Sequence, residues 1–234
     1  GLVGIYHMGQ TFALTIWQFM TGLGRVFQPE IYRKLFVNNN INNPYEIYRY
    51  LLPFLYFSIF VALIVVLFSR EFVSMFLSSK YQGATPIIII LSLYYISLFF
   101  GKITGIQLIY AKKTHITTVL IFLGAAINVG LNIPFIINWG IVGAAWATAI
   151  SGIVMMKVSY IVAQKYTKIA WQWRIVFTMY GLFLVAVIFS IIDYDFLIHS
   201  HVSLIIKLLI ILLYIIIGKF LGFFSLSEIR KLIL

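Results

Sequence analysis

Six polar side chains recur along the first apolar stretch of the sequence at helical spacing. They are related by steps of three, four or seven residues, and they are His7, Gln10, Thr11, Gln18, Thr21 and Arg25. Such positions stack on one side of an α-helix, so the spacing predicts a polar stripe along a helix over 2–27. Amides, hydroxyls and an imidazole in this pattern can bind or solvate a polar group.

A stripe of this kind needs a polar environment. Each unpaired polar group in hydrocarbon costs several kcal/mol, so we expect the stripe to face the interior of a bundle or a water-filled cavity. The alternative is that these groups hydrogen-bond to neighbouring helices and that Arg25 lies at the cytoplasmic boundary.

Further polar side chains lie within other apolar stretches. Lys102 lies about eight residues, or roughly 12 Å, before the end of its stretch, where it either binds an anionic group or extends toward the interface. Lys207 and Lys219 lie nearer to the ends of the last stretch, and we interpret both as extending to the interface. Asn128 and Asn132 share a helix face, and we expect hydrogen bonds to another helix, with a cavity role second.

The sequence contains no candidate residues for catalysis. No apolar stretch holds a carboxylate pair, and neither His-Glu-x-x-His nor a glycine-rich phosphate loop after a strand occurs. His199 and His201 have a spacing that would suit a metal on a strand, but without a third ligand we expect solvated loop histidines. The chain has no cysteine, so a thiolate metal site is excluded. We expect no enzyme, no metal and no cofactor.

The composition is typical of an integral membrane protein. Of 234 residues, 62% are hydrophobic and 10% are charged, with a mean hydropathy of +1.03. A helix needs roughly 20 apolar residues to cross the hydrocarbon core of a bilayer. Seven stretches approach that length, at 2–27, 47–69, 86–110, 116–137, 141–163, 174–192 and 202–223. The predicted fold class is therefore all-α, a polytopic membrane helix bundle with about seven transmembrane helices.

Lysine and arginine alternate between the joints that connect these stretches. Thirteen flank the first, third and fifth joints and the tail, whereas the opposite joints hold only Arg70 and Lys80. The positive-inside rule predicts a cytoplasmic C-terminus and Gly1 outside, so the net charge of +11 indicates membrane topology and no nucleic-acid partner. Seven spans that start outside favour the back half of a longer transporter. A retinal protein is the weaker alternative, because Lys207 lies near the start of its span and no Asp or Glu lies within any predicted span.

Residues 140–152 read GIVGAAWATAISG, and small side chains recur in them every three to four residues. In lipid, small residues let helix backbones approach closely. The residues expected on this packing face are Gly140, Gly143, Ala144, Ala147, Thr148, Ser151 and Gly152.

Two segments between spans mix aromatic and charged residues, and both are predicted to lie at a membrane interface. The segment 27–50 contains Pro29 near its start, and we expect this proline to end the first helix. The segment 69–86 is its outer counterpart, with Phe72, Met75 and Phe76 in the membrane and Tyr81 at the headgroups. The alternative is that both are ordinary loops.

Three stretches together resemble a known family over residues 3–160. They are VGIYHMGQTFALTIWQFM followed by FQPEIYRK, then FLSSKYQGATPIIIILSL, then LIYAKKTHITTVLIFLGAAINVGLNIPFIINWGIVGAAWATAIS, of which the last is the most specific. The chain resembles the C-terminal half of Wzx-type polysaccharide flippases. These are O-antigen and capsule repeat-unit transporters of the MOP/MATE-like superfamily.

The resemblance implies the second lobe of a two-lobe flippase in a bacterial inner membrane. Residues 1–163 would correspond to helices 8–12 of the family, and residues 164–234 to the final helix pair and a cytoplasmic tail. The implied partners are the bilayer, a missing N-terminal lobe and an undecaprenyl-diphosphate-linked oligosaccharide, which moves by alternating access. Some related flippases of peptidoglycan precursors carry an arginine where this sequence has Gln10.

The leading functional prediction is translocation of that glycolipid, with Arg25 and Lys102 attracting its diphosphate. A cation-coupled multidrug efflux transporter is one alternative, and it would need an intramembrane Asp or Glu. A membrane polymerase or ligase of glycolipids is another, but the outer joints are short. A scaffold without transport activity is a third.

Overall fold

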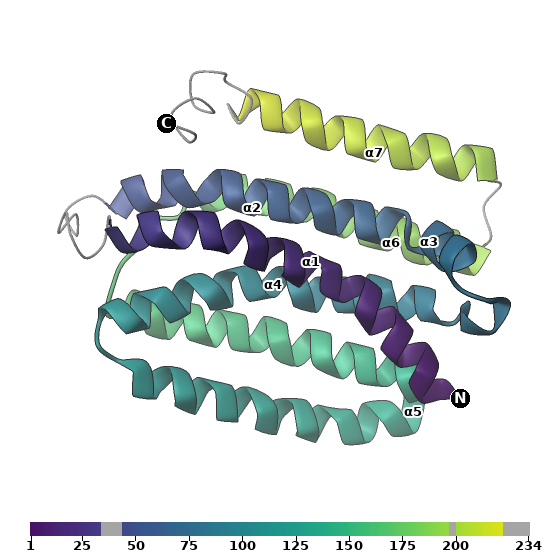
Figure 1. The fold of residues 1–234 in the computed structure, drawn as a ribbon, viewed down its shortest axis with the longest axis horizontal. Helices are drawn as coiled ribbons and strands as arrows, with labels where there is room; N and C mark the ends of the chain where they lie inside the picture. Colours follow the sequence, from purple (N-terminus) through teal and green to yellow (C-terminus); the bar gives the residue numbers. More distant parts are fainter. Residues whose placement is uncertain (34–43, 197–199, 222–234) are drawn as a thin grey trace.

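A computed structural model describes residues 1–33, 44–196 and 200–221, and within these residues the chain is helical and contains no strand. The predicted all-α fold is confirmed (Figure 1). The helices are α1 (Leu2–Tyr32), α2 (Pro44–Leu67), α3 (Ser69–Phe76), a 3₁₀ turn (Ser79–Tyr81), α4 (Ala84–Tyr110), α5 (Thr114–Gln164), α6 (Trp173–Phe196) and α7 (Ser200–Phe220).

Helix α5 is a hairpin of two antiparallel arms, 114–139 and 141–164, which Figure 1 shows side by side. The chain reverses at Gly140, whose φ of 56° and ψ of −134° favour glycine. The prediction that Gly140 belongs to the packing face is therefore wrong, since no atom lies within 4 Å of a Cβ built at this position. The packing face begins after the turn.

Five of the described helices, α2, α4, α5, α6 and α7, are long and apolar enough to cross a membrane. The structure therefore indicates a membrane protein. Helix α1 is long enough, at 31 residues, but it does not meet the same criterion because its polar side chains lower its hydropathy. Counting α1 and both arms of α5, seven helical segments pass along the bundle, in alternating directions (Figure 1).

Helix α1 continues through Pro29, so the expectation that this proline ends the helix is wrong. Pro29 has no N–H for the helical bond to the carbonyl of Arg25, but only three residues of α1 follow it, so one turn at most is affected. Arg33 at the C-cap donates to both carboxylate oxygens of Glu30, at 2.8 and 2.7 Å. Most of the joint that follows lies outside the described residues, so its interfacial placement stays a prediction.

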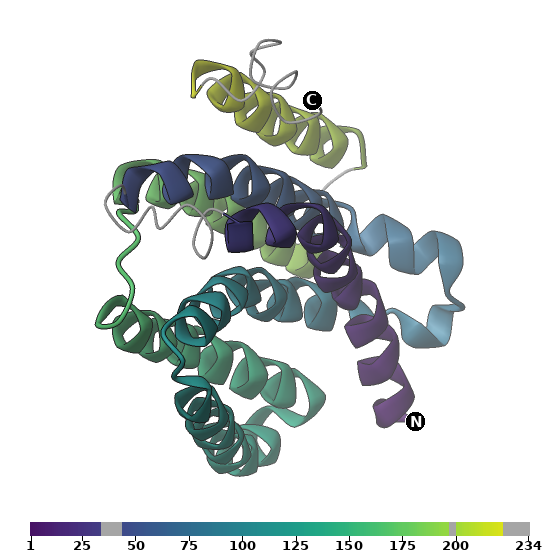
Figure 2. The same ribbon diagram turned by 60° about the vertical axis from the view of Figure 1, so that its left-hand side comes forward.

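Helix α4 lies at the centre of the bundle (Figure 2). Apolar residues occur around its whole circumference with a few polar ones between them, as is common in buried helices. Its residues Ile87 to Leu91 are all at most 3% exposed. Helix α1 runs parallel to α4. Gly9 lies against Ile87 and Gly24 lies against Lys102, so the contacts advance in the same direction along both helices. Helices α2 and α6 pack on other sides of the same core.

Candidate functional site

A groove of about 510 Å³ lies between α4 and the two arms of α5, and we call it the α4–α5 groove. Its lining combines apolar side chains with hydroxyl and amide groups, and it contains no Asp, Glu, Lys, Arg or His. Its polar lining residues are Tyr94, Ser97, Thr104, Thr117, Asn128, Thr148, Ser151 and Ser159. The groove therefore offers hydrogen bonds to a polar group without offering charge.

Glycines on α4 keep this groove open. Gly101 and Gly105 line it, and a Cβ built at either position meets no atom within 4 Å. Larger side chains at these positions would project into free space. The bare backbone of α4 is thus one wall of the groove.

Asn128 connects the two arms of α5. Its amide nitrogen donates to Ser151 Oγ at 3.0 Å and to Thr148 Oγ1 at 3.4 Å, while Asn132 donates to Asn128 Oδ1 at 2.9 Å. Asn128, Thr148 and Ser151 line the groove, and Asn132 supports Asn128 from outside the lining. Asn128 therefore makes the expected interhelical bonds and also faces the groove, whereas the hydrogen bond of Asn132 stays within the first arm.

The small residues after Gly140 lie at close helix contacts. A Cβ at Gly143 would overlap the backbone carbonyl of Phe135 on the first arm, and one at Gly152 would overlap the Tyr94 ring of α4. Ala147 is fully buried. Close approach of the second arm to both neighbours is what brings Thr148 and Ser151 within reach of Asn128.

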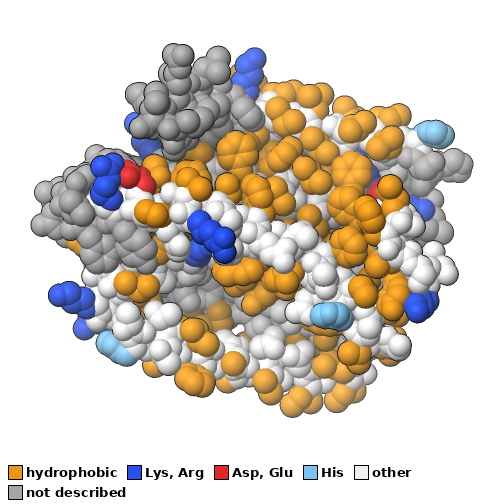
Figure 3. Space-filling view, in the orientation of Figure 1, with side chains coloured by type: hydrophobic (Ala, Val, Ile, Leu, Met, Phe, Trp, Pro, Cys, Tyr) orange, Lys and Arg blue, Asp and Glu red, His pale blue; other side chains and the backbone are white. Residues whose placement is uncertain are grey.

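The polar stripe of α1 lies on the outer surface of the described bundle. His7, Thr11, Gln18 and Arg25 are exposed, whereas Gln10 and Thr21 are half-buried. Figure 3 shows a mostly white band of polar and backbone surface along the course of α1, between apolar areas, with one basic and one histidine side chain along it. Within this chain the stripe does not face the interior of the bundle, because Ala13, Ile16 and Met20 face the core instead. That the stripe faces a water-filled cavity stays a prediction.

The cytoplasmic half of α1, in the topology predicted above, carries a basic hollow. This second pocket, of about 270 Å³, is lined by Trp17, Gln18, Thr21, Gly22 and Arg25.

Lys102 lies beside this hollow, with Nζ 5.5 Å from the centre of the Trp17 ring and 3.5 Å from the Met20 carbonyl oxygen. Gly101 and Lys102 are consecutive in α4. The α4–α5 groove and the basic hollow are therefore on adjacent sides of this helix.

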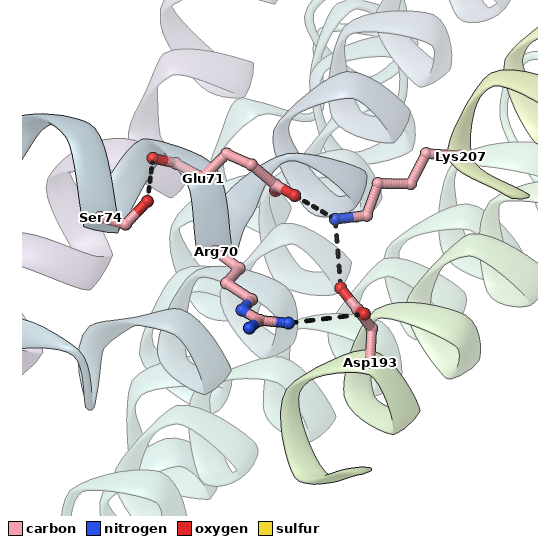
Figure 4. A network of polar contacts seen from close by, with 5 residues as sticks. All are labelled: Arg70, Glu71, Ser74, Asp193 and Lys207. Carbon is pink, nitrogen blue, oxygen red and sulfur yellow. Dashed lines mark hydrogen bonds and ion pairs between the residues drawn. The ribbon is translucent and has the colours of Figure 1, made fainter. Parts of the chain in front are cut away.

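A cluster of four charged residues lies where α3, α6 and α7 meet, and we call it the α7 ion cluster (Figure 4). Lys207 Nζ is 2.6 Å from Glu71 Oε1 and 3.1 Å from Asp193 Oδ2, and Arg70 Nη1 is 3.7 Å from Asp193 Oδ1. The side chains of Lys207 and Asp193 are 0% and 3% exposed, whereas those of Arg70 and Glu71 are 39% and 40% exposed. The formal charges of the cluster sum to zero.

This cluster corrects two predictions. Lys207 does not extend to the interface, because its ammonium is fully buried between two carboxylates. A carboxylate does lie within a spanning helix, because α6 continues to Phe196 and includes Asp193, beyond the predicted end at 192. The lack of an intramembrane carboxylate therefore no longer argues against an efflux transporter, and the argument against a retinal protein is weaker. Neither of the two described pockets includes Lys207, however. The sequence does hold a signal for this carboxylate. Ser190 and Asp193 are one helical turn apart, so Asp193 lies on the same buried face of α6 as Ser190.

The remaining candidate residues are Lys219 and the two histidines near the start of α7. Lys219 and His201 are exposed, and His199 lies outside the described residues. In the described part of the chain, no three His, Cys, Asp or Glu side chains are close enough to hold a metal.

No family model matches this sequence, and no curated protein and no solved structure matches it either. The family resemblance of the sequence stays a prediction.

Proposed function

We propose that this chain is one lobe of a membrane transporter that flips an undecaprenyl-diphosphate-linked oligosaccharide by alternating access. The observation that carries the proposal is the α4–α5 groove, an uncharged site rich in hydroxyl and amide groups within an apolar bundle. Sugar hydroxyls form hydrogen bonds with such groups, and sugar rings have apolar faces that suit the leucine and methionine side chains of the lining.

The polar stripe of α1 supports a second lobe. A helix in a membrane cannot present such a stripe to acyl chains without a large cost. Because the stripe lies on the outside of this bundle, a partner lobe or a water-filled passage has to cover it. The two-lobe arrangement implied by the family resemblance supplies both, with the passage between this chain and the missing N-terminal lobe.

The basic hollow supports an anionic headgroup. Arg25 and Lys102 place two positive charges near one end of the stripe, where they attract a diphosphate electrostatically. The sugar would then lie toward the uncharged groove while the polyprenyl tail stays in lipid. We therefore propose a transport protein without catalytic residues, in a bacterial plasma membrane with the C-terminus in the cytoplasm.

The efflux alternative is favoured by one observation, the buried carboxylate of Asp193. Coupling to a cation would require this carboxylate to bind and release a proton or a sodium ion. In the α7 ion cluster this carboxylate is already paired with Lys207, which leaves it poorly placed to bind a coupling cation. The α4–α5 groove therefore carries more weight, and it favours the flippase.

A steric test targets the α4–α5 groove in the full-length protein. Gly101→Leu places a side chain into the free space of the groove, so we expect polymer export to fall at least tenfold in complementation of a deletion strain. Gly130→Leu is the matched control, because Gly130 is exposed, lies outside the groove lining and also has no atom within 4 Å of a built Cβ. Equal export by the two variants at equal expression would contradict the proposed role of the groove.

A second test removes charge from the basic hollow. We expect the double variant Arg25→Ala, Lys102→Ala to lose export while its expression is retained. The control is Arg174→Ala, Lys219→Ala, which removes the same two residue types at exposed positions. Unchanged export by the first variant would count against diphosphate binding by this lobe.

A further inference from the structure

Helix α7 contacts the bundle along one narrow line. Its buried residues recur every three to four positions, and they are Ser203, Lys207, Ile210, Tyr214 and Gly218. The side chains between them are largely exposed, and Figures 1 and 2 show α7 on the edge of the bundle. In lipid, apolar contacts alone favour this line only weakly, because acyl chains are as apolar as the side chains they would replace.

Polar contacts at two positions along this line hold α7 in place. In the C-terminal half of α7, Tyr214 and Tyr56 each donate their hydroxyl to the backbone carbonyl of the other, at 2.9 and 3.3 Å. In the N-terminal half of α7, Lys207 reaches Glu71 on α3 and Asp193 on α6. Lys207 is fully buried, so a one-residue rotation or shift of α7 would remove its ammonium from both carboxylates.

Asp193 has a second cation within reach. Its Oδ1 is buried and accepts no hydrogen bond from the described residues, and Arg70 Nη1 lies 3.7 Å away. Arg70 is on α3, so it does not move with α7. If α7 moved outward, Arg70 could close on Asp193 and neutralise a carboxylate that would otherwise be buried without a partner.

We infer that Lys207 is a positioning residue that holds α7 on the bundle, and that Arg70 replaces it at Asp193 when α7 moves away. The α7 ion cluster then has two arrangements, one with α7 docked and one with α7 displaced. This inference does not depend on what the protein transports.

The 234 residues contain no cysteine, so introduced cysteines are the only labelling sites on this chain, and any cysteine elsewhere in the full-length protein is first replaced by serine for a direct test in nanodiscs. Nitroxide labels at Phe57→Cys on α2 and Leu212→Cys on α7, both exposed, report the distance between these helices. We expect one dominant short distance and a minor longer population in the unmodified background, and at least a tenfold rise of the longer population in Lys207→Met. Lys219→Met, which removes an exposed lysine from the same helix, should leave the distribution unchanged, and Lys207→Arg should restore docking in part.

Variants of Arg70 test whether the α7 ion cluster has two arrangements or is a fixed structural ion pair. Arg70→Gln alone should leave the distance distribution unchanged, because Lys207 still neutralises Asp193. In the Lys207→Met background, Arg70→Gln should lower the melting temperature further and reduce the displaced population, because Asp193 then has no cation. Equal effects of Arg70→Gln in both backgrounds would overturn the role of Arg70.

A Lys207→Met distribution identical to that of Lys219→Met would overturn the role of Lys207. If Lys207→Met does not fold, the neutral double variant Lys207→Met, Asp193→Asn serves instead, since it leaves no unpaired buried charge. A longer population is expected there because residue 207 no longer pairs with Glu71 or residue 193, and Arg70→Gln should not change it because the neutral side chain of Asp193→Asn needs no cation. A single short distance would overturn the role of Lys207.

Discussion

The α7 ion cluster and the α4–α5 groove are both polar regions inside an apolar bundle, and they differ in charge and in space. The cluster is charged, and its two central side chains, Lys207 and Asp193, are at most 3% exposed. The groove is uncharged, encloses about 510 Å³ and is bounded by bare glycine backbone. A buried charge requires a fixed partner, whereas neutral hydroxyl and amide groups can exchange a protein partner for water or a ligand at small cost. The first region therefore suits holding helices together, and the second suits binding.

The largest expected effect concerns the helix contact that forms the groove. Gly143→Val would place its side chain into the backbone carbonyl of Phe135, which cannot move away as a flexible side chain could. We expect a loss of about 3 kcal/mol or more in the free energy of unfolding, seen as little folded protein in size-exclusion chromatography. Gly130→Val is the control, and similar yields of the two variants would show that the α5 hairpin is packed differently.

The next largest expected effect is the difference in stability loss between variants of the two carboxylates in the α7 ion cluster. Asp193→Asn leaves the ammonium of Lys207 with one carboxylate, and a buried pair that loses a partner typically costs about 3 kcal/mol. Glu71→Gln should cost about 1 kcal/mol or less, because the Glu71 side chain is 40% exposed and water can replace the carboxylate. Thermal unfolding of both variants in one detergent measures the difference. Equal losses would mean that water reaches both carboxylates alike.

A smaller effect is expected for the hydrogen bonds across the groove. Asn128→Ala removes the bonds to Thr148 and Ser151, and interhelical bonds of this kind average about 0.6 kcal/mol in membranes. A double-mutant cycle with Ser151→Ala should give a coupling energy of that order. Export should fall by much more than this stability loss accounts for, because Asn128 also lines the groove. Export that follows stability alone would make Asn128 a packing residue.

The smallest stability effect is expected on the α1 stripe. Thr11→Val and Gln18→Leu replace exposed polar side chains, so the free energy of unfolding of this chain should change by about 0.5 kcal/mol or less. Maleimide labelling of Thr11→Cys and Gln18→Cys in the full-length protein should show access to water, since a passage is expected there. Both positions sealed in every condition would contradict a water-filled passage and favour direct contact with a second lobe.

Local sequence patterns predicted the elements well. The apolar stretches located the long helices, and the helical spacing of Asn128 and Asn132 with the small residues after Gly140 indicated close contact in α5. These predictions succeed because helix formation and the sharing of a helix face depend on residues three or four positions apart. The class of cargo follows from the resemblance and stays a prediction.

Long-range contacts could not be predicted in the same way. Lys207 and Glu71 are 136 positions apart, and from its place near the start of a span Lys207 was expected to reach the interface. The turn at Gly140 required the backbone conformation of a single residue, which a run of small residues does not specify.

The amino-acid sequence by itself determined that this is an all-α membrane protein, which apolar stretches form its long helices and that one face of α1 is polar, because hydropathy and helical periodicity are local properties. Only the tertiary structure decided that the α1 stripe faces outward, that Gly140 turns the chain and that Lys207 is paired with Asp193 and Glu71. The physical reason is that the burial of a charge and the direction of a helix face depend on which other helices pack beside them.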